Sequence, residues 1–213
     1  MTVEKGKFIS FEGIDGAGKS TQIENVETFL NQNKIKTLKI REPGGTFLGE
    51  TLRKLILNQN QNNQFNCQTH ALLMYAARIE LLEKIIQPAL NQNVWVLSDR
   101  FFDSTFAYQG GGENLGFDKI NQLNQWALNH FEPDLTLFFQ IDLKQAQKRI
   151  ENNRNENSKD HFEKKNPNFF QKVQEMYLFL AKNNPKRIKT INANDDLTFV
   201  KNNVLNIIKD FLK

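Results

Sequence analysis

Cysteine is almost absent from this sequence: Cys67 is the only one, so the chain cannot form an internal disulfide. This is typical of proteins in a reducing compartment, and we expect a cytoplasmic location. No run of about 18 uncharged apolar residues occurs, which excludes a membrane-spanning helix. The opening MTVEKGKFIS also lacks the apolar centre of a secretory signal. We therefore expect no membrane partner.

Arginine is scarce, and positive charge is only slightly in excess. The chain has 7 Arg against 21 Lys, and its net charge of +4 is spread along the sequence. No basic face with interleaved aromatic residues is present, so we expect no nucleic-acid partner. Because Lys fills the ordinary solvated positions of positive charge, we expect Arg where a planar donor to phosphate or carboxylate is needed. The seven positions are Arg41, Arg53, Arg78, Arg100, Arg149, Arg154 and Arg187, the last interpreted as a surface charge.

Short apolar runs alternate with longer helical patterns along the 213 residues. At about 150 residues per domain, residues 1–213 are expected to form a single domain. Strands are expected at Lys7–Phe11, Thr37–Arg41, Val94–Leu97, Leu135–Ile141 and Ile188–Ile191. Helices are expected at Lys19–Gln32, Phe47–Leu57, Thr69–Leu90, Phe117–His130, from Leu143, Phe169–Lys182 and Leu197–Leu212, with a flexible loop at Gly110–Gly112. This alternation indicates an α/β fold with a parallel sheet covered on both faces.

A glycine-rich loop directly follows the first expected strand. The stretch GIDGAGKS fits the pattern G-x-x-x-x-G-K-[ST], with the strand before and the helix after that this motif requires. Its glycines allow backbone N–H groups to converge on phosphate oxygens at a helix N-terminus. Lys19 is expected to act in catalysis by neutralising the β- and γ-phosphates. The predicted ATP-binding residues are Gly13, Ile14, Asp15, Gly16, Ala17, Gly18, Lys19, Ser20 and Thr21.

The third expected strand supplies the acidic residue that usually accompanies such a loop. It leads into Asp99, and a carboxylate at the carboxyl end of a strand can hold Mg²⁺ through water. The Ser20 hydroxyl is expected to bind the same ion. Ser20 and Asp99 are therefore the predicted metal-binding residues, with Mg²⁺ as the cofactor and ATP as the phosphoryl donor.

The motif leaves open what happens to the nucleotide. A guanine-reading N-K-x-D sequence, which a GTPase switch would need, is absent. Arg41, Arg53, Arg78 and Arg100 stand at strand and helix ends, and four guanidinium groups facing one crevice would repel one another without an anionic ligand. This set favours a second phosphate-bearing substrate. Because a phosphate acceptor is already ionised, positioning and charge neutralisation would suffice for phosphoryl transfer without a general base.

Five motifs then follow one another over nearly the whole chain. They are FEGIDGAGKST, REPGG, YAAR at Tyr75–Arg78, SDRFFDSTFAYQGGG at Ser98–Gly112 and PDLTLF at Pro133–Phe138. Together they resemble the thymidylate kinase family of the bacterial type. The resemblance implies a P-loop kinase fold with a five-stranded parallel sheet and a mobile lid, here about residues 149–168. It also implies a homodimer that converts dTMP and ATP to dTDP and ADP.

The resemblance further implies which residues hold the sugar and phosphate of the acceptor. Asp15 matches the carboxylate that holds the 3′-hydroxyl. Glu42 and Pro43 match the turn that lines the thymidylate site. Arg53 and Arg100 match the arginines that hold the acceptor phosphate, and Arg100 is expected to be catalytic.

A second group of matches concerns the base. Arg78 matches the guanidinium beside the thymine ring, and Thr105 and Gln109 match groups at the base edge. Tyr108 resembles the ring whose bulk disfavours a ribose 2′-hydroxyl. Met74 stands where the family usually places a Phe that stacks on thymine. A thioether can still pack on a ring face, so we expect weaker or less selective stacking.

The lid is expected to carry a further catalytic cation. The family's D-R-x-E stretch is Asp160-His161-Phe162-Glu163 here, without the Arg. Family members without a positive residue in the phosphate loop, where this chain has Gly16, supply that charge from the lid. Arg154 is the first choice and Arg149 the second, each reaching the transferred phosphoryl group when the lid closes.

Two alternatives remain open at this point. Met74 is consistent with a kinase for another acceptor, such as dUMP, another pyrimidine monophosphate or a deoxynucleoside. A nucleotide-gated binding ATPase without a phosphoryl acceptor is the second alternative, and the set of Arg residues argues against it.

Overall fold

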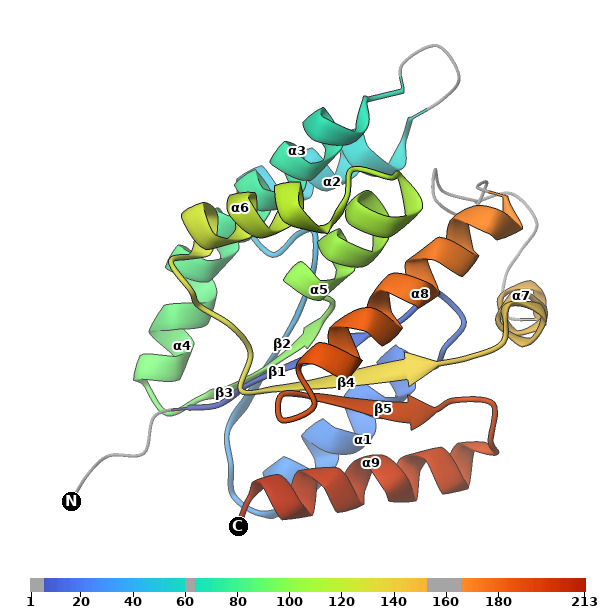
Figure 1. The fold of residues 1–213 in the computed structure, drawn as a ribbon. Coiled ribbons are helices and arrows are strands. Elements are labelled where there is room, and N and C mark those ends of the chain that lie inside the picture. Colours follow the sequence, from blue (N-terminus) through green and yellow to red (C-terminus); the bar gives the residue numbers. More distant parts are fainter. Residues whose placement is uncertain (1–5, 60–63, 153–165) are drawn as a thin grey trace.

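A single sheet of five parallel strands forms the centre of the described chain, in the order β2-β3-β1-β4-β5 (Figure 1). The structure is a computed structural model and describes residues 6–59, 64–152 and 166–213. The strands are β1 (Phe8–Glu12), β2 (Thr37–Arg41), β3 (Trp95–Asp99), β4 (Leu135–Gln140) and β5 (Ile188–Asn192). The predicted five-stranded parallel sheet is confirmed.

The carboxyl ends of the central strands bring the predicted motifs together. β1 lies between β3 and β4, and Phe11 of β1 pairs with Asp99, which also pairs with Arg41 of β2. After β1 the chain forms β2 and β3 on one side of this strand and then β4 and β5 on the other. Ligands of such sheets bind beyond the carboxyl ends of the strands, at the point where the strand order reverses. A ligand site is therefore expected where the loop after Glu12 meets Asp99 and Arg41.

Helices cover both faces of the sheet (Figure 1). One face packs against α1 (Lys19–Gln32) and α9 (Leu197–Phe211), and the other against α5 (Phe102–Thr105) and α8 (Pro167–Asn183). An outer layer consists of α2 (Phe47–Leu57), α3 (Cys67–Leu81) and α6 (Phe117–Leu128), while α7 (Leu143–Asn152) lies beyond the carboxyl end of β4. Because both faces are covered, all five residues of β1 are buried, including the polar Ser10 and Glu12.

The long helix predicted from Thr69 to Leu90 has an earlier start and an irregular centre. It begins at Cys67, because the Asn66 side chain accepts a hydrogen bond from the Thr69 N–H at 2.8 Å and caps the first turn. A π-helical turn, η1 (Leu82–Ile86), separates α3 from α4 (Gln87–Asn91). Pro88 follows this wider turn, and it has no N–H to donate to a regular preceding turn.

The loop predicted at Gly110–Gly112 is a helical segment instead. These glycines belong to η2 (Phe106–Gly112), a π-helical segment that continues α5. A Cβ on Gly111 would lie 2.8 Å from the Lys172 carbonyl oxygen, and one on Gly112 would lie 2.5 Å from the Phe169 ring. The prediction is wrong because these two glycines allow η2 to pack closely against α8, rather than making the chain flexible.

Candidate active site

The loop between β1 and α1 has the conformation that its motif requires. Gly13, Gly16 and Gly18 have φ angles of 136°, 79° and 87°, which residues with side chains rarely adopt. A Cβ on Gly13 would lie 2.6 Å from the Phe139 carbonyl oxygen, and one on Gly16 would lie 2.5 Å from that of Ala146. Glycine is therefore required at both positions. The loop places the amino end of α1 at the carboxyl edge of the sheet, where N–H groups can bind phosphate oxygens.

Lys19 begins α1 directly after this loop and is only 5% exposed. Its Nζ donates to the Ile14 carbonyl at 3.3 Å and lies 3.6 Å from Asp15 Oδ1 and 3.9 Å from Asp99 Oδ1. The ammonium group is therefore surrounded by oxygen atoms at the point where the loop faces Asp99.

Asp99 and Ser20 are the groups here that could hold a divalent cation. Asp99 Oδ1 is buried and has no hydrogen-bond partner among the described residues, and Ser20 is exposed on the first turn of α1. In the same parts of the chain no three His, Cys, Asp or Glu side chains form a metal-binding group. One carboxylate and one hydroxyl suit Mg²⁺, which is commonly held by one or two carboxylates together with substrate phosphates and water.

Arg100 reaches from the end of β3 to the phosphate loop. Its Nη2 donates to Asp15 Oδ1 at 2.8 Å and to the Tyr108 hydroxyl at 3.2 Å. Its Nη1 donates to the Gly13 carbonyl at 2.9 Å and to Ser104 Oγ at 3.2 Å. The Arg100 φ of 74° lies in the left-handed region. This unusual backbone and the four contacts hold the guanidinium group in one orientation.

A cavity of about 170 Å³ opens beside Arg100. Its wall contains nine of the predicted site residues, Asp15, Glu42, Pro43, Arg53, Met74, Asp99, Arg100, Tyr108 and Gln109, together with Arg41, Leu57 and Ser104. Arg53 Nη1 donates to the Pro43 carbonyl at 3.0 Å, and Arg41 Nη1 donates to it at 3.2 Å. The turn after β2 thus holds two guanidinium groups at the cavity.

Arg78 lies beneath this cavity and is 1% exposed. Its Nε donates to Glu42 Oε2 at 2.7 Å, its Nη1 to Thr105 Oγ1 at 3.0 Å and its Nη2 to the Phe101 carbonyl at 3.2 Å. Burial raises the pKa of the Glu42 carboxyl, although the Arg78 charge opposes this. Arg78 is not among the residues of the cavity wall, and Glu42, which is in that wall, balances its charge. The roles of Arg78 and Thr105 beside a base stay predictions.

Gln109 lines the cavity with an amide that is 1% exposed. Neither its Nε2 nor its Oε1 has a hydrogen-bond partner in the described structure. Leaving a buried polar group unsatisfied costs about 1–3 kcal/mol. Such a group is expected where a ligand supplies the missing donor and acceptor.

Arg187, interpreted from the sequence as a surface charge, is largely buried. Its side chain is 10% exposed, and Nη1 and Nη2 donate to the two carboxylate oxygens of Asp103 at 2.6 and 2.9 Å. The guanidinium carbon lies 5.0 Å from the centre of the Phe102 ring. The surface interpretation is wrong because Arg187 pairs with the buried Asp103. This pairing could not be foreseen, since Asp103 is 84 positions away in the sequence.

Only one of the two expected lid arginines falls within the described chain. Arg149 lies in α7, and its Nη2 donates to the Ala193 carbonyl at 2.9 Å. Arg154 and the stretch from Asp160 to Glu163 lie outside the described residues. Both ends of the predicted lid are helical, because α7 extends to Asn152 and α8 begins at Pro167.

Glu12 is a buried residue beside this site that the sequence analysis did not single out. It ends β1, and its carboxylate accepts hydrogen bonds from the Phe101 N–H at 2.7 Å, the Ser104 hydroxyl at 2.6 Å and the Tyr177 hydroxyl at 2.9 Å. Burial, with a smaller effect from the charge of Asp103, raises its pKa to about 8. An ionisable residue at the end of an apolar run, directly before the phosphate loop, is the signal that could have identified it.

Comparison with known proteins agrees with this geometry. A family model described as thymidylate kinase matches residues 11–204. The chain belongs to the thymidylate kinase family. The thymidylate kinase of Nitrosospira multiformis is 46% identical over 200 residues, which cover 94% of this chain and 95% of that protein. The thymidylate kinase of Mycoplasma capricolum is 47% identical over 206 residues, covering 97% and 96% of the two chains.

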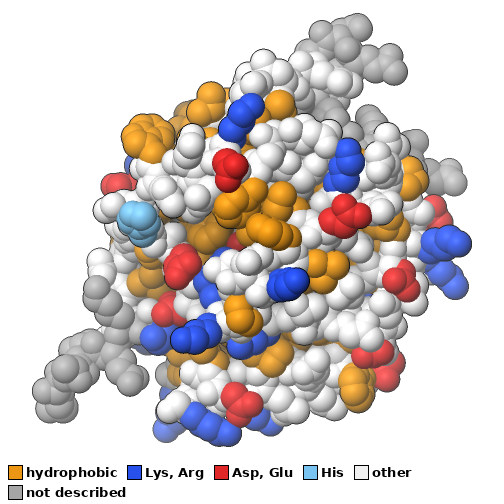
Figure 2. All heavy atoms as spheres, in the orientation of Figure 1, with side chains coloured by type: hydrophobic (Ala, Val, Ile, Leu, Met, Phe, Trp, Pro, Cys, Tyr) orange, Lys and Arg blue, Asp and Glu red, His pale blue; other side chains and the backbone are white. Residues whose placement is uncertain are grey.

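A solved thymidylate kinase structure has the same fold. The crystal structure from Ehrlichia chaffeensis superposes with a TM-score of 0.75 at 32% identity, covering 96% of this chain and 99% of that one. As a thymidylate kinase family member, this protein is a nucleoside monophosphate kinase. In the parts of the chain described here, no helix is both long and apolar enough to cross a membrane. On the face drawn in Figure 2, Lys and Arg side chains are interspersed with Asp and Glu.

Proposed function

We propose that this kinase transfers the γ-phosphoryl group of ATP to dTMP, with Mg²⁺ as the cofactor, and releases dTDP and ADP. The observation that carries the proposal is a cavity beside Lys19 whose wall combines Arg53 and Arg100 with the unpartnered amide of Gln109. The two guanidinium groups suit a phosphate. The buried amide suits a base edge, and the combination therefore suits a nucleoside monophosphate.

In this proposal the acceptor extends along the cavity from phosphate to base. Its phosphate lies between Arg53 and Arg100, and Asp15 accepts from the 3′-hydroxyl. Tyr108 borders the sugar, and Met74 packs on the base. Thymine presents an N–H between two carbonyl groups, so a single amide of Gln109 can donate to one carbonyl and accept from the N–H.

The donor nucleotide occupies the phosphate loop from Gly13 to Thr21. Backbone N–H groups at the amino end of α1 and the Lys19 ammonium neutralise its phosphates. Ser20 and Asp99 hold Mg²⁺, which supplies charge neutralisation on the transferred phosphoryl group when it is bound. Lys19 and Arg100 then stand on the donor and acceptor sides of the cavity.

Phosphoryl transfer here needs no residue that removes a proton. A phosphate oxygen of dTMP is already ionised and attacks directly, so the protein contributes alignment and positive charge. Arg100 balances the acceptor charge, and its contacts with Asp15 and Gly13 hold it next to the phosphate loop. We retain Arg154 and, as second choice, Arg149 as the additional cation for the transferred group.

The proposal is tested by offering the purified protein Mg-ATP with dTMP, dUMP, dCMP or thymidine in turn. We expect the highest kcat/KM with dTMP, and dTDP and ADP in equal amounts by chromatography. A clear preference for another acceptor would replace dTMP by that compound. ATP hydrolysis that responds to no monophosphate would favour a nucleotide-gated binding ATPase.

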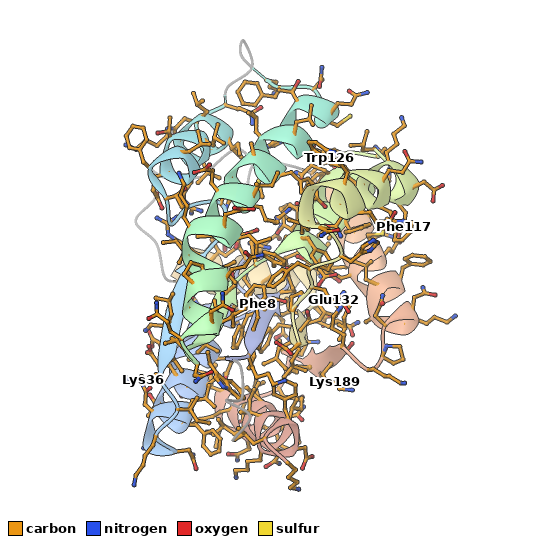
Figure 3. All side chains as sticks on the ribbon, turned by 90° about the vertical axis from the view of Figure 1, so that its left-hand side faces the viewer. Phe8, Lys36, Phe117, Trp126, Glu132 and Lys189 are labelled. Carbon is orange, nitrogen blue, oxygen red and sulfur yellow. The ribbon has the colours of Figure 1, made fainter. Side chains whose placement is uncertain are left out.

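We further propose that the partner is a second copy of this chain. The α3 helix contacts both α2 and α6, and these helices expose Trp126 by 77%, Leu72 by 56% and Leu55 by 51%. Figure 3 shows Trp126 on α6, beside α3. Exposed large apolar side chains on neighbouring helices are typical of an interaction surface.

We also infer a cytoplasmic location. The single cysteine, Cys67, is free and half-buried at the start of α3. A free thiol persists in a reducing compartment, which is where we place the reaction.

A further inference from the structure

Three side chains from distant parts of the chain meet beneath the phosphate loop. Glu12 at the end of β1, Ser104 of α5 and Tyr177 of α8 form what we call the Glu12 cluster, and each is at most 3% exposed. Glu12 Oε2 accepts from Ser104 Oγ at 2.6 Å and from Tyr177 Oη at 2.9 Å, and these two hydroxyl oxygens lie 2.8 Å apart. Ser104 alone among the three lines the cavity.

The direction of these hydrogen bonds leads to Arg100. A guanidinium group has no acceptor, so Arg100 Nη1 must donate to Ser104 Oγ across 3.2 Å. When Glu12 is ionised, Ser104 gives its single hydrogen to the carboxylate, so the lone pairs of Ser104 are left toward Arg100. Glu12 thus sets the orientation of the Ser104 hydroxyl that receives Arg100.

Glu12 also holds the backbone next to Arg100. Its second oxygen, Oε1, accepts from the Phe101 N–H at 2.7 Å, one residue after the left-handed Arg100 with φ of 74°. A residue in that conformation needs surrounding contacts that maintain it. The same carboxylate therefore restrains Arg100 through its main chain and, by way of Ser104, through its side chain.

We propose that Glu12 and Tyr177 are positioning residues that hold Arg100 in the orientation required by the acceptor phosphate. Glu12 acts through Ser104 and Phe101, and Tyr177 acts by donating to the Glu12 carboxylate. The proposal rests on the function proposed above, because it takes Arg100 as the group that binds the acceptor. A carboxylate in the core is costly unless donors satisfy it, and the three donors here come from β3–α5 and α8.

The first test compares two Tyr-to-Phe variants that each remove one buried hydroxyl. Tyr177→Phe keeps the ring that stacks on Phe138 at 4.9 Å, and Tyr75→Phe removes a 2.8 Å bond to Asn124 Oδ1, outside the cluster. A hydrogen bond of ordinary net strength corresponds to about a fivefold change in an equilibrium constant. We expect Tyr177→Phe to raise KM for dTMP about fivefold, with KM for ATP unchanged, and Tyr75→Phe to change neither. Equal effects of the two variants would overturn the role of Tyr177.

The second test asks whether Glu12 and Ser104 act on Arg100 together. Glu12→Gln keeps an oxygen that can accept from the Phe101 N–H, but it presents an NH₂ group to Ser104. This NH₂ group then competes with Arg100 as a donor to the Ser104 hydroxyl. Above about pH 8, where Glu12 is ionised, we expect KM for dTMP to rise about tenfold in Glu12→Gln, and the double variant Glu12→Gln/Ser104→Ala to be no worse than the more affected single variant. Multiplying effects in the double variant would show that the two residues act separately and would refute the mechanism.

A readout without substrate separates this inference from the proposed function. Rotation of the Arg100 guanidinium group can be followed by ¹⁵N NMR of the free protein above about pH 8, where Glu12 is ionised. We expect hindered rotation in the wild type and in Tyr75→Phe, and faster rotation in Glu12→Gln and Tyr177→Phe. Unchanged rotation in these two variants refutes the positioning role. A wild-type protein that does not phosphorylate dTMP refutes the proposed function, whatever the rotation shows.

Discussion

Arg53 shows how one side chain can be tested at the scale of the residue. It reaches the cavity from α2, and its Nη1 donates to the Pro43 carbonyl at 3.0 Å. Hydrogen bonds to a charged group contribute about 1.5–3 kcal/mol each. We expect Arg53→Ala to raise KM for dTMP by about tenfold or more while KM for ATP stays the same, as measured by steady-state kinetics. Lys54→Ala, an exposed neighbour on the same helix, is the control and should be neutral.

Met74 tests the base side of the same cavity. It is 7% exposed and lies in the cavity wall, where an aromatic ring would have a larger face for a pyrimidine. Aromatic pairs contribute about 0.5–1.5 kcal/mol beyond their buried area. We expect Met74→Phe to lower KM for dTMP about threefold and to sharpen the preference for dTMP over dUMP. Met74→Leu keeps the volume without a ring and should match the wild type; an equal gain in both variants would contradict stacking.

At the scale of the element, the packing of η2 against α8 supports the site from behind. Gly111 of η2 approaches the Lys172 carbonyl so closely that a Cβ would lie 2.8 Å from it, whereas the atom nearest to a Cβ on Gly110 would be a side-chain carbon of Ile120, at 3.4 Å. Overpacking a tight contact costs about 1–3 kcal/mol. We expect Gly111→Ala to lower the free energy of unfolding by that amount in urea, and Gly110→Ala to change it little. A neutral Gly111→Ala would mean that α8 can move away from η2.

At the scale of the whole molecule, Glu12 makes stability depend on pH. Burial raises its pKa in the folded protein to about 8 from an ordinary 4.5, so between these values the folded state holds a proton that the unfolded state has lost. The free energy of unfolding should therefore fall as the pH rises from about 4.5 to about 8 and receive no further change from Glu12 above that. Glu42, whose pKa burial also raises, acts in the same direction.

The variant Glu12→Gln isolates this effect because an amide does not titrate. Urea unfolding at about pH 5.5, 7 and 8.5 should show a flatter dependence for Glu12→Gln than for the wild type. Asp118→Asn, which removes an exposed carboxylate of α6, should keep the wild-type slope. If Glu12→Gln keeps it too, Glu12 has an ordinary pKa in the folded protein.

Assembly belongs to the same scale. Replacing Trp126 by Asp places a charge in the proposed contact between copies, and we expect sedimentation velocity to show monomers where the wild type forms dimers. Phe199 of α9 is 60% exposed on the other side of the sheet, so Phe199→Asp should leave the dimer intact. Dissociation by both variants, or by neither, would argue against a dimer contact at α3 and α6.

Local sequence was sufficient for most elements and for the phosphate loop. The bounds of α1, α2 and β2 agree with the prediction at both ends, because apolar periodicity and caps such as Thr46, which accepts from the Gly49 N–H, act within a few residues. The motif residues from Gly13 to Ser20 could be assigned for the same reason. Irregular helices were missed, since η1 and η2 depend on how Pro88 and the glycines at 111 and 112 fit against other parts of the chain.

Partners that are remote in the sequence could be found only from the folded chain. Glu42 meets Arg78 across 36 positions, Asp103 meets Arg187 across 84, and Glu12 meets Tyr177 across 165. Each pair contains a charged group or a hydroxyl that is buried on folding, and such pairing leaves no periodic pattern in the sequence. Strand order brings these residues together. It also separates the guanidinium groups that line the cavity from those that are buried in the core.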